Sequence, residues 1–182
     1  MFSPLPHTLF LLTLFALSGS VRAQDRQIRQ LADNIDRLEA YLDQRDVLAP
    51  KVSAVPVAWH LDHMLKVVKS IHGSLAASDP ADYRYKFKPT RTLVFTMGRF
   101  PRGVAESPKS VRPPDTITTT AIREQLAEVR ALLPTFAGMD KRQHFTHFTF
   151  GPLNRRRTVK FINIHTRHHL RIVEDILLAV ND

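Results

Sequence analysis

The chain has 182 residues, a hydrophobic content of 43% and no cysteine, which favours one folded domain and excludes disulfides, thiolate metal sites and a cysteine nucleophile. Any transition-metal site must therefore be built from histidine, carboxylate and water, as is typical of catalytic or labile centres. The formal net charge of +9 is compatible with nucleic acid, an anionic membrane surface or acidic small molecules as partners. Because the basic residues show no nucleic-acid-binding motif, we expect a solvated basic surface and do not expect nucleic acid as a partner.

The N-terminus is typical of an export signal. Residues 9–17 form an apolar core, and Val21 and Ala23 are the small residues that precede a cleavage site, here predicted after Ala23. The apolar stretch is too short for a stable membrane span. We therefore expect residues 1–23 to be a cleaved signal peptide, residues 24–182 to be the mature domain and the location to be periplasmic or secreted, with an uncleaved anchor as the alternative.

Four segments have apolar residues at alternating spacings of three and four, which predicts an amphipathic helix in each. The four predicted helices are residues 26–48, 57–75, 119–133 and 155–180. Pro56 suits the start of the second helix, Thr118 or Thr119 is the predicted N-cap of the third, and Asn154 is that of the fourth.

Two long segments, residues 78–117 and 134–153, lack clear periodicity. The first is rich in proline and contains only a short apolar piece at 93–97. A connection of this length in a compact domain usually has a function or covers something. Four amphipathic helices without a strong strand pattern predict an all-α fold, a four-helix bundle with two long irregular connections.

The last predicted helix carries two histidines, His165 and His169, four residues apart. Side chains at this spacing lie one turn apart on the same helix face, so their nitrogens can converge on one ion. The spacing of Ile162 and Ile172 places both histidines on the stripe that faces the core. Buried imidazoles need partners, and these are either a metal ion or one another, the backbone and water.

Three stretches of the sequence together resemble the DinB-like superfamily of four-helix bundles with metal sites. They are residues 57–64 in the second helix, 100–109 in the first connection, and 150–170 leading into the last helix. The last stretch is the most specific, and the stretch in the connection supports a closer likeness to a branch with no assigned reaction.

The resemblance implies a three-histidine site for a divalent metal such as zinc, nickel or iron. One ligand comes from the second helix and two from an H-x-x-x-H pair in the last, which correspond here to His63, His165 and His169. His60 also lies near the apolar stripe of the second helix and is the alternative to His63. Relatives with known activity include thiol S-transferases and a maleylpyruvate isomerase.

Several neighbouring residues have two interpretations. His144 and His147 are candidate acid–base groups or exposed histidines of the second connection, and His168 is expected to flank the pair. Asp62 is expected either to orient a ligand histidine or to face solvent, and Trp59 is expected to pack at the helix start.

Three cations of the first connection, Arg99, Arg102 and Lys109, are candidates for binding an anionic substrate, the alternative being a solvated loop. The sequence lacks the motifs of serine hydrolases, of P-loop nucleoside triphosphatases and of dinucleotide-binding proteins.

These observations predict an exported, divalent-metal-dependent enzyme that activates water or a thiol for hydrolysis or transfer on a small substrate. Export disfavours the thiol-transferase version, because the thiol cofactors of those relatives are cytosolic. The alternatives are a non-catalytic periplasmic protein that binds a metal or an anionic ligand, and a basic envelope-binding or nucleic-acid-binding module whose salt-dependent binding survives loss of the histidines. A homodimer is left open.

Overall fold

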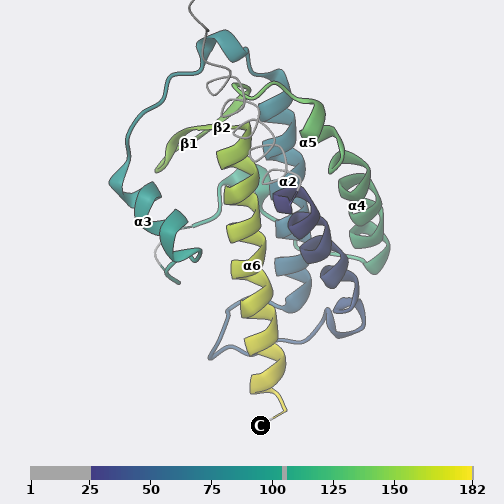
Figure 1. The fold of residues 1–182 in the computed structure, drawn as a ribbon. Helices are drawn as coiled ribbons and strands as arrows, with labels where there is room; N and C mark the ends of the chain where they lie inside the picture. The colour runs from purple at the N-terminus through teal and green to yellow at the C-terminus, as the bar shows by residue number, and fades with distance from the viewer. Residues whose placement is uncertain (1–25, 104–105, 182) are drawn as a thin grey trace, which may run out of the picture.

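The structure is a computed structural model that describes residues 26–103 and 106–181, so the signal peptide expected over 1–23 lies outside the described residues. The first described element is a helix over residues 26–39, which we call the N-terminal helix. The elements that follow are η1 (Leu42–Gln44), α2 (Val57–Ala77), η2 (Pro80–Asp82), α3 (Pro89–Met97), η3 (Lys109–Val111), α4 (Thr119–Leu132), α5 (Thr135–Gly138), β1 (His144–His147), β2 (Gly151–Asn154) and α6 (Arg155–Ala179). The fold is mostly helical, as expected (Figure 1).

The long helices α2, α4 and α6 begin where the sequence predicts. The Thr118 side chain accepts a hydrogen bond from the Ala121 amide at the start of α4, and the Asn154 side chain accepts one from the Arg157 amide at the start of α6. Both predicted N-caps are confirmed, and each satisfies one of the amides that a helix start leaves without an intrahelical partner. α2 packs against both α6 and α4 (Figure 1).

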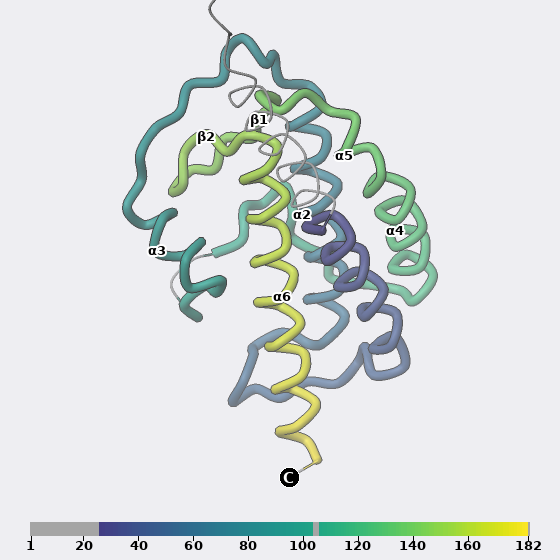
Figure 2. Tube along the Cα trace, in the orientation of Figure 1, coloured from purple at the N-terminus to yellow at the C-terminus, as the bar shows by residue number. Residues whose placement is uncertain are grey.

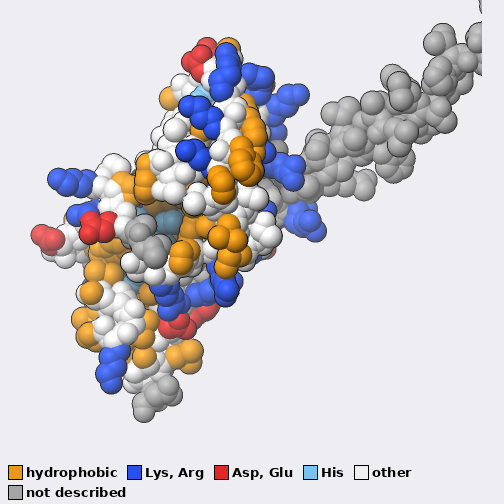
Figure 3. Space-filling model, turned by 90° about the vertical axis from the view of Figure 1, so that its left-hand side faces the viewer, with side chains coloured by type: hydrophobic (Ala, Val, Ile, Leu, Met, Phe, Trp, Pro, Cys, Tyr) orange, Lys and Arg blue, Asp and Glu red, His pale blue; other side chains and the backbone are white. Residues whose placement is uncertain are grey.

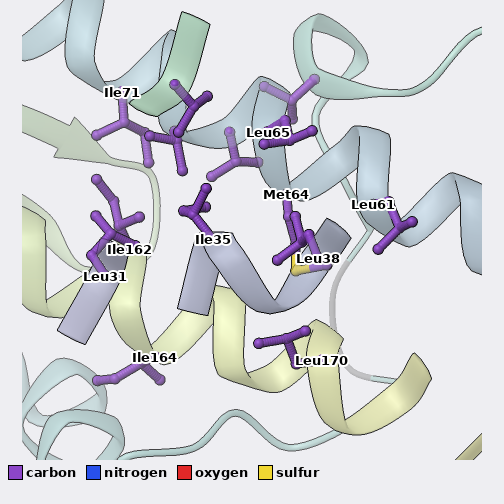
Figure 4. Close-up of a cluster of buried hydrophobic side chains, with 14 of the residues drawn as sticks. Leu31, Ile35, Leu38, Leu61, Met64, Leu65, Ile71, Ile162, Ile164 and Leu170 are labelled. Atoms are coloured by element: carbon purple, nitrogen blue, oxygen red, sulfur yellow. The ribbon is translucent and has the colours of Figure 1, made fainter. Parts of the chain in front are cut away.

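The core forms where the apolar stripes of the long helices meet (Figure 4). Leu31, Ile35 and Leu38 of the N-terminal helix are fully buried at the spacing that the sequence shows. They lie beside Met64 of α2 and Ile162 of α6, which are also fully buried. The N-terminal helix ends at residue 39, earlier than expected, and the chain continues through a turn into η1.

The first connection contains a helix, α3, that the sequence analysis missed. Pro89 occupies its first turn, where a missing amide hydrogen is harmless, and Gly98 ends it in the left-handed conformation with φ 63°. Its buried residues are only Arg91 and Val94. With one polar residue among two buried ones, the sequence of α3 shows no apolar stripe.

The second connection contains the short helix α5 and an antiparallel hairpin, so it is not irregular throughout. β1 and β2 pair with His144 opposite Asn154 and His147 opposite Gly151. Gly151 has φ 67°, a conformation that only glycine adopts without strain, at the point where the chain turns back. The prediction of an all-α fold is therefore corrected by one short antiparallel hairpin.

The buried side chain of Arg91 connects these two segments. Its guanidinium donates to the carbonyl oxygens of Phe150 and Lys86 at 2.9 and 2.6 Å, and to that of Pro152 at 3.4 Å. α3 and the hairpin therefore lie together on one side of α6, as the trace in Figure 2 shows. None of the helices in the described residues is both long and apolar enough to cross a membrane.

Candidate metal centre

Four histidines meet where α2 packs against α6. α2 supplies His60 and His63 from adjacent turns, and α6 supplies His165 and His169. His60, His63 and His169 are buried, with 4%, 2% and 8% of their surface exposed, and His165 is partly buried. The continuation of the apolar stripes through these positions places polar rings in the interface between the two helices.

Three of these rings, His63, His165 and His169, each offer one nitrogen within 4.8 Å of the others, close enough to hold a metal ion together. His63 Nε2 and His165 Nε2 are 3.3 Å apart. Two nitrogen ligands on one tetrahedral zinc ion would be about 3.4 Å apart, since each Zn–N bond is about 2.0–2.1 Å. The structure thus brings together the three residues that the sequence and the resemblance selected.

The hydrogen bonds of His63 leave one of its nitrogens available as a ligand. His63 Nδ1 lies 2.9 Å from the carbonyl oxygen of Val111. A carbonyl oxygen only accepts, so Nδ1 carries the hydrogen and Nε2 of the neutral ring presents its lone pair to His165. Ser107 Oγ lies 3.5 Å from the same Nε2.

His60 is a neighbour of the three-histidine group and is bonded at both nitrogens. Its Nδ1 lies 3.0 Å from Nδ1 of His169, and its Nε2 lies 3.0 Å from Oγ of Ser53. The Ser53 hydroxyl in turn bonds to the carbonyl oxygen of Val55 at 3.0 Å. His60 therefore has protein partners on both sides, whereas His63 has one nitrogen facing the other histidines.

Burial keeps the histidines of the site neutral. It lowers the pKa of His63, lowers that of His60 to about 4, and holds those of His165 and His169 well below the ordinary value of 6.5. Neighbouring histidines lower the pKa of His165 and His169 further. Metals bind the neutral form of imidazole, so no proton has to leave at neutral pH.

One fully buried nitrogen of the site has no hydrogen-bond partner among the described residues. His165 Nδ1 is buried and makes no hydrogen bond there, while its Nε2 faces the lone pair of His63. A buried polar atom without a partner is costly and rare in folded proteins, and this one is not the nitrogen that faces His63.

Aromatic rings surround the site on several sides. Trp59 stacks on His63 with centroids 4.8 Å apart, and Phe161 stacks on His165 at 6.0 Å. Phe100, from the first connection, lies edge-on to His165 and His168. Figure 3 shows histidine side chains recessed among hydrophobic ones on the side of the molecule that carries α3. These rings reduce the access of water and lower the local dielectric.

The other predicted histidines lie in different places. His168 flanks the site as expected, with its ring 5.2 Å from that of His169, and burial lowers its pKa to about 4. The ring of Phe161 lies between His147 and His165 in the chain of contacts, because it contacts both of their rings. His144 pairs with Asn154, which precedes His165 by about 16 Å along the helix axis. The structure therefore does not bring His144 to the site.

Asp62 follows neither of the two interpretations. It is buried with 2% of its surface exposed, so it does not face solvent. Its carboxylate lies 2.7 Å from Lys66 Nζ and accepts a 2.7 Å hydrogen bond from Gln125. The contact with Gln125 links α2 to α4, and among the described contacts Asp62 orients no histidine.

The three cations of the first connection are all exposed. Arg102 forms a 2.6 Å ion pair with Asp175 of α6, and its charge contributes to lowering the pKa of His168 and of His60. Lys109 begins η3, whose last residue is Val111, the partner of His63. Arg99 follows Gly98, the residue that ends α3.

Sequence reasoning missed the partners of the histidines, Ser53 and the Val111 carbonyl, and did not assign Phe161 to the site. The i, i+3 spacing of His60 and His63 was the available signal for His60. Nothing in the sequence indicates which backbone carbonyl folds over His63.

These features define a mostly helical protein with a buried cluster of neutral histidines between two of its helices. The sequence pattern of the DinB superfamily matches residues 22–173, most of the chain, and the chain therefore belongs to that superfamily. No curated protein and no solved structure matches it.

Proposed function

We propose that the protein binds one divalent metal ion through His63, His165 and His169 and uses it in an enzymatic reaction. The observation that carries the proposal is the convergence of one nitrogen from each ring within 4.8 Å, in a chain of the DinB superfamily. The 3.3 Å separation of the facing nitrogens of His63 and His165 supports the same ligand set.

The scaffold in this proposal is a four-helix bundle. The N-terminal helix, α2, α4 and α6 each supply fully buried apolar residues to one core, which supports it. Bundles of this kind build metal sites from side chains on facing helices.

Three neutral histidine ligands leave a coordination position for water or substrate, and a bound divalent ion would lower the pKa of a water or thiol held there. The chain itself contributes the surrounding rings of Trp59, Phe100 and Phe161, which restrict water. We propose hydrolysis or group transfer on a small substrate as the reaction.

The charges near the site support an anionic substrate. Arg102 lies close enough to affect the pKa of His168 and His60, and Lys109 belongs to the segment that contacts His63. We propose Arg102 and Lys109, together with Arg99, as its binding residues. Among the connection histidines, His147 is the acid–base candidate, since its ring shares Phe161 with His165.

We also propose that the chain is exported and that residues 24–182 form the mature domain, on the strength of the apolar stretch and the small residues before the predicted cleavage site. An N-terminus at Gln24 in protein isolated from the producing cells is the expected result, and an N-terminus at Met1 would contradict it.

Metal content tests the site. Inductively coupled plasma mass spectrometry of the untagged protein should find about one equivalent of one divalent metal, as expected for a single set of three ligands. The double variant His165→Ala/His169→Ala should contain none. His72→Ala is the matched control, because His72 lies on α2 and contacts Thr135 of α5 instead of the cluster.

Absence of metal from the wild-type protein, also after reconstitution with zinc, nickel or iron, would overturn the proposal and leave histidines that bond to one another. Metal that is bound but supports no metal-dependent turnover in a substrate screen would favour the second candidate, a non-catalytic protein that binds a metal or an anionic ligand.

A further inference from the structure

Large hydrophobic side chains are exposed on one side of the molecule. Of the eight such residues in the described part of the chain, five belong to the α3 region or to the hairpin turn. They are Tyr85, Phe87, Leu93, Met97 and Phe148, with 52%, 66%, 61%, 48% and 72% of their surface exposed. We call the surface that they form, with the cations between them, the α3 face.

The hydrophobic residues of the α3 face come from separate segments that lie together. Leu93 and Met97 are four residues apart on α3, so they share one exposed face of the helix. Phe148 is in the turn between β1 and β2, and the carbonyls of the hairpin are bonded to Arg91 of α3. Figure 3 looks onto this side and shows hydrophobic side chains interspersed with lysines and arginines.

The two segments that form the α3 face carry charges of one sign. Residues 83–103 contain six lysines or arginines and no aspartate or glutamate, and residues 144–171, which pack against them, contain another six and again no acid. Of these cations, Arg102 is paired with an acid, Asp175, from outside both segments. Arg84, Lys86 and Arg99 are exposed between the hydrophobic residues.

From this combination we infer that the α3 face is a docking surface for the headgroup region of an anionic lipid bilayer. Exposed aliphatic and aromatic residues gain free energy by entering the boundary between headgroups and acyl chains, and the surrounding cations attract anionic headgroups. We expect both contributions to be needed, since hydrophobic side chains and cations are interspersed on this face.

Two other occupants fit the α3 face less well. A second copy would bring two cationic surfaces of the same sign together in a symmetric dimer, which is unfavourable. Single-stranded nucleic acid is bound by stacking its bases on aromatic rings, and Leu93 and Met97 offer none. The bilayer makes use of both residue types.

Sedimentation with vesicles tests the inference. The probes are vesicles of phosphatidylcholine alone and vesicles containing about 30% phosphatidylglycerol, a content in the range at which anionic lipids attract basic segments. The wild-type protein should bind only the anionic vesicles, and binding should weaken as salt is raised. Variants are compared by the ratio of their vesicle-binding constants to that of the wild type. Any contribution of the N-terminal residues cancels in this ratio, since all the proteins carry the same N-terminus.

Two double variants separate the contributions. Leu93→Ser/Met97→Ser should weaken binding about tenfold by removing exposed apolar surface. Lys86→Ser/Arg99→Ser should weaken it by a similar factor and reduce the salt dependence. Leu178→Ser/Lys51→Ser is the matched control, since it removes an exposed hydrophobic residue and an exposed cation from other parts of the chain, and it should bind within about twofold of the wild type.

The inference is overturned if the wild-type protein does not bind anionic vesicles, or if Leu93→Ser/Met97→Ser binds as well as the matched control. It is also overturned if Leu93→Ser/Met97→Ser retains vesicle binding and instead no longer dimerises or no longer binds DNA. His165→Ala/His169→Ala should bind vesicles normally, so that the outcome is independent of the metal site.

Discussion

A chain of hydrogen bonds runs from His169 through His60 to Ser53, and the hydrogens in it can be placed consistently with His169 as a metal ligand. If His169 binds the metal through Nε2, its Nδ1 carries a hydrogen and donates it to His60 Nδ1 across 3.0 Å. His60 then donates from Nε2 to Ser53 Oγ, and the serine hydroxyl donates to the Val55 carbonyl. The chain of bonds holds the His169 ring in one orientation, a role that partners of metal ligands commonly have.

Replacing His60 should therefore weaken metal binding without abolishing it. We expect His60→Ala to raise the metal dissociation constant about tenfold or more, and Ser53→Ala to raise it less, because Ser53 acts through His60. Metal competition titrations measure the constants, and His72→Ala is the control.

A His60→Ala protein that contains no metal would contradict this role and make His60 a ligand. The stability of the metal-free His60→Ala protein should be measured as well. A substitution that only destabilises the fold would lower the free energy of unfolding of the metal-bound and metal-free forms equally.

His147 should make folding stability depend on pH. Its Nδ1 accepts hydrogen bonds from the amides of Thr149 and Phe150, so the ring must be neutral, and burial lowers its pKa to about 4. Because the unfolded chain takes up the proton near pH 6.5, this stabilisation is complete above pH 6.5 and is lost as the pH falls towards about 4.

The test is to compare wild type and His147→Phe by urea denaturation at several pH values. The phenylalanine ring retains the packing between Phe148 and Phe150, and the variant should lose less stability than the wild type between pH 6.5 and 4. Equal losses would show that His147 titrates normally in the folded protein.

At the scale of secondary structure, two glycines in helical segments should respond to substitution in opposite ways. Gly98 ends α3 with φ 63°, whereas Gly73 lies in α2 with nothing within 4 Å of an added Cβ. Gly98→Ala should destabilise the protein by about 1 kcal/mol, and Gly73→Ala should stabilise it by about 0.5–1 kcal/mol. Denaturant midpoints of the two variants check this, and a destabilising Gly73→Ala would contradict it.

The helices that the sequence predicts well are those with long apolar stripes. α2, α4 and α6 begin within a residue of the expected positions, because their periodic apolar residues and their N-caps agree. α3 was not predicted because one of its two buried residues is Arg91, and the four-residue strands are too short for a pattern. Such elements depend on contacts between distant segments.

The same distinction holds for the candidate site. The spacing of His165 and His169 indicates their shared face, while the assignment of His63 over His60 came from the resemblance. The contacts of His60 depend on how α2 and α6 are rotated against each other, which tertiary packing determines.

For the whole molecule, a metal bound between α2 and α6 should stabilise the fold. A ligand that binds only the folded state raises stability by RT ln(1 + [L]/Kd), about 2.7 kcal/mol at a hundredfold excess over Kd. Thermal melts with chelator and with added metal should therefore differ by several degrees in the wild type. They should coincide in His165→Ala/His169→Ala, and a difference that persists there would place the binding elsewhere.

Arg91 has a consequence for the lengths of the two connections. One guanidinium donates to the carbonyls of residue 86 and of the hairpin, which are about sixty positions apart in the sequence. All three bonds form only if neither segment changes its length independently of the other. Insertions or deletions, which surface loops usually accept, would here leave buried carbonyls without a donor. Homologous chains should therefore vary in length outside the region around Arg91, and a change within it should be accompanied by a change in the hairpin.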